Sequence, residues 1–109
     1  MPKPMTPSEQ LVGRRIPKLP SNRDVLLAGF IREDGTTCAR SEPGDRHLRP
    51  AFLKLRREGL VRLQSRLSLQ GGKAFGIWQL TDRGEPLARE ASERIRAITA
   101  ARRAWADDF

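Results

Sequence analysis

The amino-acid sequence predicts an α+β fold, and changes in the spacing of its apolar residues carry this prediction. Residues 48–58 place apolar side chains at helical spacing, residues 60–80 alternate apolar with polar side chains, and residues 85–105 return to helical spacing. Glycines lie where helix gives way to strand (Gly59) and between the two alternating runs (Gly71-Gly72). A chain of 109 residues is long enough for one such domain with a modest core.

The two ends of the chain differ from its middle. Residues 1–20 hold five prolines and few large apolar side chains, and proline fixes φ and supplies no backbone N–H. We therefore expect residues 1–20 to be a flexible basic tail, with a minor-groove arm at residues 13–18 as the alternative. The expected folded domain covers residues 21–84, and residues 85–109 form a C-terminal helix.

Two helices are expected before the break at Pro43-Gly44. Ser21 is a suitable N-cap for a first helix over residues 22–33, which Asp34-Gly35 ends. Thr36 or Thr37 can then cap a second, short helix through residues 39–41.

The stretch LRPAFLKLRREGLV predicts a third helix with one buried face. Its apolar residues recur at helical spacing, at Leu48, Ala51, Phe52 and Leu55. Gly59 suits the position just after the helix, where positive φ is common. Pro50 leaves two starts open: near Arg49, with Pro50 at the first position, or at Asp45, with a distorted first turn.

The alternating runs predict a hairpin that turns at Gly71-Gly72, because glycine accepts the positive φ of a two-residue turn. Pairing Gln70 with Lys73 then sets Leu69 opposite Ala74, Leu67 opposite Gly76, Ser65 opposite Trp78, and Leu63 opposite Leu80. The expected polar face carries Arg62, Gln64, Arg66, Ser68, Lys73 and Gln79, with Phe75 and Ile77 as apolar exceptions.

A last helix is expected after Thr81, which is a suitable cap. Its apolar stripe consists of Leu87, Ala91, Ile95, Ile98 and Trp105. This stripe is longer than one small domain covers, so it predicts a homodimer through the C-terminal helix. The alternative is that the helix folds back onto the first helix.

The net charge of +8 is concentrated in the middle of the chain. Residues 45–75 carry eight Lys and Arg against two Asp and Glu, whereas residues 76–109 carry six of each. A localised basic block is typical of a protein that binds a polyanion, because phosphate contacts release condensed counterions.

Several other classes of function are not expected. One cysteine (Cys38) and one histidine (His47) provide neither a disulfide nor a metal site, and no phosphate loop or catalytic set is present, so we expect no cofactor and no enzyme activity. No apolar run approaches the roughly 20 residues of a membrane span, and the N-terminus does not resemble a signal peptide. The expected location is a reducing cytoplasm, without membrane association.

Two short motifs flank the predicted hairpin: Leu55-x-x-x-Gly59-Leu60-Val61 before it and Leu80-Thr81-x-x-Gly84-x-x-Leu87 after it. With these motifs, residues 22–90 resemble the winged helix-turn-helix family, of the MarR-like or PadR-like kind. The resemblance implies three helices, a two-stranded wing and a C-terminal helix. It also implies a third helix in the DNA major groove and a wing on the backbone or minor groove. Residues 37–44 depart from the family, because they are short and broken for a second helix.

The basic residues of the third helix and the hairpin form the predicted site. Arginine suits a guanine edge or a phosphate because its planar fork donates two hydrogen bonds. The predicted DNA-binding residues are Arg46, Arg49, Leu53 and Arg56 on one helix face, Lys54 and Arg57 beside it, and Arg66 and Lys73 near the wing tip.

The predicted function is sequence-specific binding of double-stranded DNA by a small transcriptional regulator. The alternative is a winged-helix module that binds protein, of the kind that serves phages and mobile elements as an adaptor or inhibitor. The broken second helix, Pro50, and the apolar Phe75 and Ile77 favour that alternative. Single-stranded nucleic acid fits less well, because the predicted surface is poor in aromatic residues.

Overall fold

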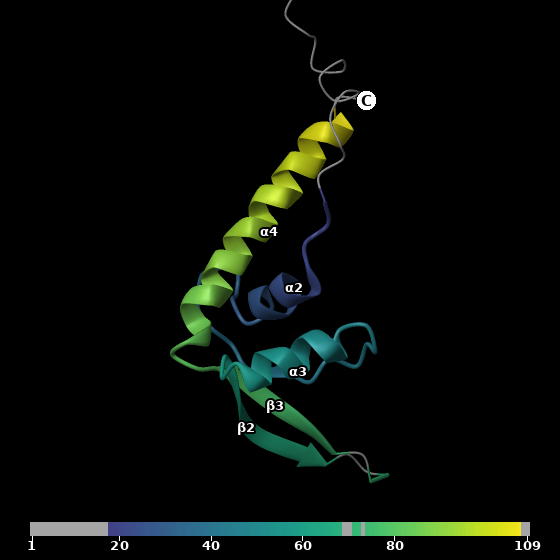
Figure 1. The fold of residues 1–109 in the computed structure, drawn as a ribbon, viewed down its shortest axis with the longest axis vertical. Helices are drawn as coiled ribbons and strands as arrows, with labels where there is room; N and C mark the ends of the chain where they lie inside the picture. The colour runs from purple at the N-terminus through teal and green to yellow at the C-terminus, as the bar shows by residue number, and fades with distance from the viewer. Residues whose placement is uncertain (1–17, 69–70, 73, 108–109) are drawn as a thin grey trace, which may run out of the picture.

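The computed structural model of the chain describes residues 18–68, 71–72 and 74–107. Within them lie three helices and a three-stranded antiparallel sheet of order β1-β3-β2, which confirms the predicted α+β class. In chain order the elements are α2 (Asn22–Ala28), β1 (Arg40–Ser41), α3 (Arg49–Arg57), β2 (Val61–Ser68), β3 (Ala74–Leu80) and α4 (Gly84–Asp107) (Figure 1). Residues 1–17 of the expected tail, and Lys73 at the expected wing tip, lie outside the described residues.

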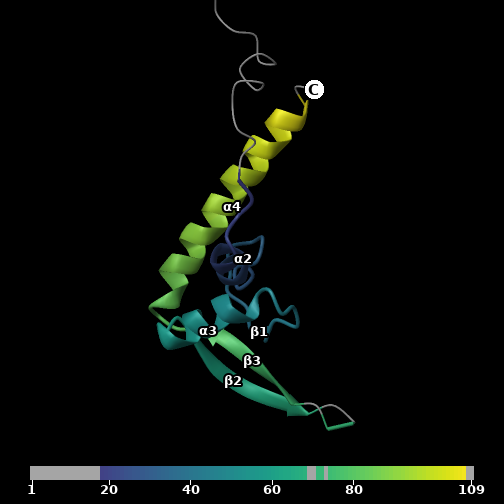
Figure 2. The same cartoon turned by 45° about the vertical axis from the view of Figure 1, so that its right-hand side comes forward.

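The elements follow one another along the length of the molecule. The hairpin of β2 and β3 lies at one end, α3 lies next to it, and α2 lies beyond α3 (Figure 1). Helix α4 begins near the base of the hairpin and runs past α2, and β1 lies beside β3 (Figure 2). The buried apolar side chains are Leu27, Phe30, Phe52, Leu55, Leu60, Val61, Trp78, Ala88 and Ala91.

Helix α2 begins where the sequence predicts and ends earlier. The Ser21 side chain accepts a hydrogen bond at 3.1 Å from the backbone N–H three residues later, as an N-cap does. The predicted extent to residue 33 is wrong, because the chain turns after Ala28 and pairs Ile31 with Thr37. The turn between these paired residues includes Gly35, whose φ is 86°.

The predicted second helix is also wrong, because its last residues form strand β1. The register of β1 on β3 pairs Arg40 with Trp78 and Ser41 with Ile77. The sheet therefore has three strands, instead of the two of the predicted wing. Pro43 disfavours helical geometry in the residue before it. The edge of β3 provides hydrogen-bond partners instead, and the Glu42 N–H donates to the Gly76 carbonyl at 3.1 Å.

Helix α3 begins at Arg49, which confirms the first of the two predicted starts. Pro50 lies in the first turn, where it breaks no helical hydrogen bond. Asp45 does not cap the helix: its side chain accepts a hydrogen bond from the His47 backbone N–H at 2.9 Å. Arg46 therefore lies in a turn before α3 and not in the helix.

The end of α3 has the geometry predicted for Gly59. Its φ is 72°, and its N–H donates to the Arg56 carbonyl at 3.1 Å. The Leu60 N–H donates to the Leu55 carbonyl at 3.0 Å, which completes a Schellman motif. The chain leaves this motif directly into β2.

The hairpin register differs from the predicted one. The pairs are Val61–Leu80, Arg62–Gln79, Leu63–Trp78, Ser65–Ile77, Arg66–Gly76, Leu67–Phe75 and Ser68–Ala74. The two glycines do have positive φ, 110° at Gly71 and 88° at Gly72. Strand β2 ends at Ser68 and β3 begins at Ala74, and the predicted Gln70–Lys73 pair lies outside the described residues. A bulge at Gln64 shifts the pairing once more.

The bulge redistributes the side chains between the two faces of the hairpin. Arg66 is opposite Gly76, on the face of β3 that carries Trp78, whereas Arg62 is opposite Gln79 on the other face. The predicted single polar face is therefore wrong. The face without Trp78 carries an apolar patch of Leu67, Phe75 and Ile77, of which Leu67 is 48% exposed.

The two motifs that flank the hairpin meet in one joint. The Thr81 hydroxyl donates to the Gly59 carbonyl at 2.6 Å, and the Thr81 N–H donates to the Leu60 carbonyl at 3.0 Å. The same hydroxyl accepts from the Gly84 N–H at 3.2 Å at the start of α4, so the predicted cap is confirmed. We call Gly59, Leu60, Thr81 and Gly84 the α3–α4 joint.

Helix α4 packs on α2 through its first half. Ala88 and Ala91 are fully buried. The Arg94 guanidinium donates to both carboxylate oxygens of Asp24, from Nε at 2.9 Å and from Nη2 at 2.8 Å. This fork is the main reason that the pKa of Asp24 lies below its ordinary value. No helix in the described part of the chain has the length and apolar character needed to cross a membrane.

Candidate nucleic-acid interface

The outward face of α3 carries cations together with one exposed leucine. At about 100° per residue, Arg57 projects roughly opposite Leu48 and the buried side of the helix. Arg49, Leu53 and Arg57 follow one ridge, each four residues from the next, and all three are exposed. Leu53 is 45% exposed, although leucine is usually buried.

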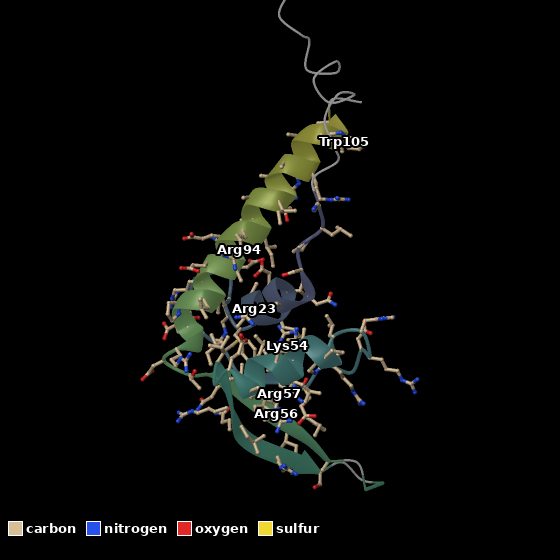
Figure 3. The ribbon with its side chains drawn as sticks, in the orientation of Figure 1. Arg23, Lys54, Arg56, Arg57, Arg94 and Trp105 are labelled. Carbon is tan, nitrogen blue, oxygen red and sulfur yellow. The ribbon has the colours of Figure 1, made fainter. Side chains whose placement is uncertain are left out.

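Arg56 occupies a different position from the other helix cations. Its guanidinium carbon lies 4.5 Å from the centroid of the Trp78 ring, in a cation–π contact. Trp78 is held in turn by an edge-to-face contact with Phe52, with centroids 5.3 Å apart, and by its indole N–H, which donates to Glu42 at 3.1 Å. Arg56 therefore lies at the junction of α3 and the sheet, with its charge still exposed (Figure 3).

Lys54 lies on the side of α3 that faces α2 (Figure 3). It lines a groove of about 450 Å³ together with Arg23 and Glu58, which form an ion pair with each other. Arg46 and His47 lie in the turn before α3, and His47 lines the same groove. The Asn22 side chain donates to the His47 carbonyl at 3.3 Å. This contact ties the turn before α3 to the start of α2.

The hairpin contributes two described cations. Arg66 shares a face with Trp78 and hence the side of the sheet on which α3 lies, whereas Arg62 lies on the opposite face. With its side-chain amide turned so that the oxygen faces Arg62, Gln79 accepts hydrogen bonds from that guanidinium. The site prediction omitted Arg62, although the strand alternation had already placed it beside Arg66 and Lys73.

Acidic side chains are scarce around the cations of α3 and the hairpin, where residues 45–68 carry two acids, Asp45 and Glu58. The ion pairs, Arg23–Glu58, Arg89–Glu85, Arg94–Asp24 and Arg94–Glu90, all involve α2 or α4. In residues 18–68, 71–72 and 74–107, ion pairs are absent at Arg46, Arg49, Lys54, Arg56, Arg57, Arg62 and Arg66. We call these seven side chains the basic surface. The predicted site residues lie on α3, the turn before it and the hairpin, but on more than one face, since Lys54 faces α2 and Arg56 contacts Trp78; Lys73 lies outside the described residues.

A second hollow lies where the predicted second helix is missing. It has a volume of about 270 Å³ and lies between α2, residues 40–44 and α3. Its two charged lining groups are already engaged: Arg40 donates to the Gly29 carbonyl at 3.2 Å, and Glu42 accepts from Trp78. Cys38 is half-buried, and its thiol donates weakly to the Gly29 carbonyl at 3.6 Å. Among the described residues, no three His, Cys, Asp or Glu side chains gather into a metal site.

Comparison of the chain with protein-family models, with curated proteins and with solved structures finds no match.

Proposed function

We propose that this chain is a winged helix-turn-helix protein that binds double-stranded DNA in a sequence-specific manner and regulates transcription. In this proposal α3 enters the major groove, and the hairpin is the wing that contacts the backbone. The observation that carries the proposal is the basic surface: its seven exposed cations lack ion pairs, and residues 45–68 around them carry two acids, of which Glu58 is paired with Arg23. Unpaired cations clustered along one helix and an adjacent hairpin are the electrostatic footprint of a protein that binds a polyanion.

The dimensions of α3 support this docking. An α-helix with its side chains is about 10–12 Å in diameter, which the roughly 12 Å wide major groove admits, and α3 presents nine residues along its length. Arg66 projects from the face of the sheet on which α3 lies, so it can approach the same duplex. Arg62 projects from the other face, and we expect it to contribute less.

Gel-shift titrations at several salt concentrations test the proposal. If five of the cations each neutralise one phosphate, the logarithm of the association constant falls with the logarithm of salt concentration with a slope of about −4.5. Arg57→Ala should reduce the magnitude of this slope by about 1. Arg96→Ala is a matched control, because it removes an exposed arginine from the middle of α4, outside the basic surface. Absence of binding to any duplex at low salt would refute the proposal.

We also propose that the protein acts as a homodimer through α4. Helix α2 has seven residues and extends about 10 Å, whereas α4 has 24 residues and extends about 36 Å. Helix α2 therefore covers only part of α4, and Ile98 lies in the half that continues beyond it. Light scattering that gives a monomer mass at micromolar concentration would contradict the dimer.

One observation favours protein binding as a second candidate function. The patch of Leu67, Phe75 and Ile77 lies on the face of the hairpin opposite α3 and is partly exposed. A protein partner that co-purifies in stoichiometric amount without nucleic acid, and that Leu67→Asp releases, would favour this function over DNA binding.

A further inference from the structure

Leu53 lies at the centre of the outward face of α3. It is the fifth of the nine helical residues, and it is 45% exposed. Its neighbours three and four residues away on the helix surface are Arg49, Pro50, Arg56 and Arg57. The ridge therefore presents one large apolar group inside a ring of three cations.

We propose that Leu53 is a specificity-determining residue that contacts the 5-methyl group of a thymine in the major groove. This inference rests on the proposed DNA-binding function. Among the groups at the base-pair edges of the major groove, the thymine methyl is the apolar one, and the others are hydrogen-bond donors and acceptors. A leucine at the midpoint of a groove-bound helix thus has one apolar counterpart, while Arg49 and Arg57 on the same ridge remain available for phosphates and guanine edges.

Charge complementarity selects DNA over a protein as the occupant. The ring around Leu53 carries three positive charges and no acid among its helix neighbours. Arg56 is held over Trp78 at 4.5 Å, so one cation of the ring is ordered before any ligand binds. A duplex presents phosphates on both sides of the methyl group, which matches an apolar centre with a cationic rim.

Thymine-to-deoxyuridine replacement tests the inference, because it removes only the methyl group. The probe is the duplex recovered by selection from a random DNA library, with each thymidine replaced singly by deoxyuridine. At one position we expect the affinity of the wild-type protein to fall about fourfold, which corresponds to the free energy of burying one methyl group. Leu53→Ala should bind the thymine and deoxyuridine duplexes with equal affinity, while retaining the wild-type salt dependence.

Controls separate the contact from the fold. Alanine favours helix more than leucine does, so circular dichroism and the melting temperature of Leu53→Ala should remain close to wild type. Leu19→Ala is the matched variant, because Leu19 is 72% exposed and lies before α2. This variant should show the same roughly fourfold loss of affinity as wild type when deoxyuridine replaces the thymine.

The outcomes distinguish the inference from the function on which it rests. A selected site without a sensitive thymine would overturn the inference alone, as would equal deoxyuridine sensitivity in wild type and Leu53→Ala. Failure of selection together with absence of low-salt binding would overturn the DNA-binding function and the inference with it. In that case, release of a co-purifying acidic protein by Leu53→Asp would assign the same surface to a protein partner.

Discussion

Replacing Gly84 by alanine tests the α3–α4 joint, where the structure allows no side chain. A Cβ at this position would lie 2.0 Å from the Leu60 carbonyl oxygen, 2.9 Å from its carbonyl carbon and 3.1 Å from its Cα. All three are backbone atoms, and the carbonyl already accepts the Thr81 N–H. Relief of the contact therefore requires α4 to move away from Leu60 by about 1 Å or more.

The expected cost follows from the contacts that this movement breaks. Overpacking costs about 1–3 kcal/mol. Weakening of the two hydrogen bonds from Thr81 to Gly59 and Leu60 adds about 1 kcal/mol each. At an ordinary helix position, Gly→Ala would instead stabilise the folded protein by about 1 kcal/mol. At Gly84 we expect its effect on the free energy of unfolding to have the opposite sign. We expect a net loss of about 2–4 kcal/mol, which lowers the melting temperature by about 10 °C or more.

Thermal and urea unfolding followed by circular dichroism measures this loss. Gly44→Ala is the matched control, because its Cβ would meet no atom within 4 Å and its φ is not positive. The control should melt at or slightly above the wild-type temperature. A Gly84→Ala protein that melts within about 2 °C of wild type would show that the joint is not rigid, against the packing argument.

Three further substitutions test individual contacts. Arg56→Ala should cost about 0.5–1 kcal/mol and change the fluorescence of Trp78, because the cation–π contact is lost; unchanged stability and emission would contradict that contact. Arg94 lowers the pKa of Asp24 below 3.8, so the pair stabilises fully above that pH, and its contribution is lost as pH falls through the folded-state pKa. Asp24→Asn should accordingly be less stable than wild type at neutral pH, and the gap in urea midpoint should close on acidification rather than persist. Gly76→Ala would place a Cβ 2.7 Å from the Trp78 indole nitrogen and break the hydrogen bond from Trp78 to Glu42. The expected loss of stability, measured by urea unfolding, is about 1 kcal/mol, and wild-type stability would argue against that bond.

The parts of the fold that the sequence predicted correctly depend on local chemistry. Ser21 caps α2, Gly59 ends α3 with positive φ, and Thr81 caps α4, each through hydrogen bonds within a few residues. The buried stripe of α3 was likewise predictable, because helical periodicity alone places Phe52 and Leu55 on the same side.

The incorrect predictions depend on contacts between distant segments. Residues 40–41 follow no strand pattern of their own, and they become β1 because the edge of β3 offers hydrogen bonds more than 30 residues later in the sequence. The bulge at Gln64 could not be predicted either, because the alternating pattern predicts a continuous ladder. One inserted residue moves the side chains on one side of the bulge to the opposite face of the hairpin. The consequence for the site is direct, since it separates Arg62 from Arg66.

The site itself was predictable as a set of charges but not as an arrangement. A basic block at residues 45–75 is visible in the sequence, but which cations lack acidic partners depends on the tertiary structure. Arg56 shows the limit most clearly, because its contact with Trp78 joins a helix to a strand that lies 22 positions further along the chain.

The motifs behind the family resemblance and the residues behind the functional proposal occupy different places in the molecule. Gly59, Thr81 and Gly84 meet in the α3–α4 joint, where they fix the angle at which the chain enters and leaves the hairpin. None of them belongs to the basic surface, so a protein that binds no DNA can require them equally. Substitutions in the joint should therefore lower stability and leave the salt dependence of the remaining folded protein unchanged. Substitutions such as Arg57→Ala should do the reverse, and a variant set that fails to separate in this way would contradict the division between scaffold and binding surface.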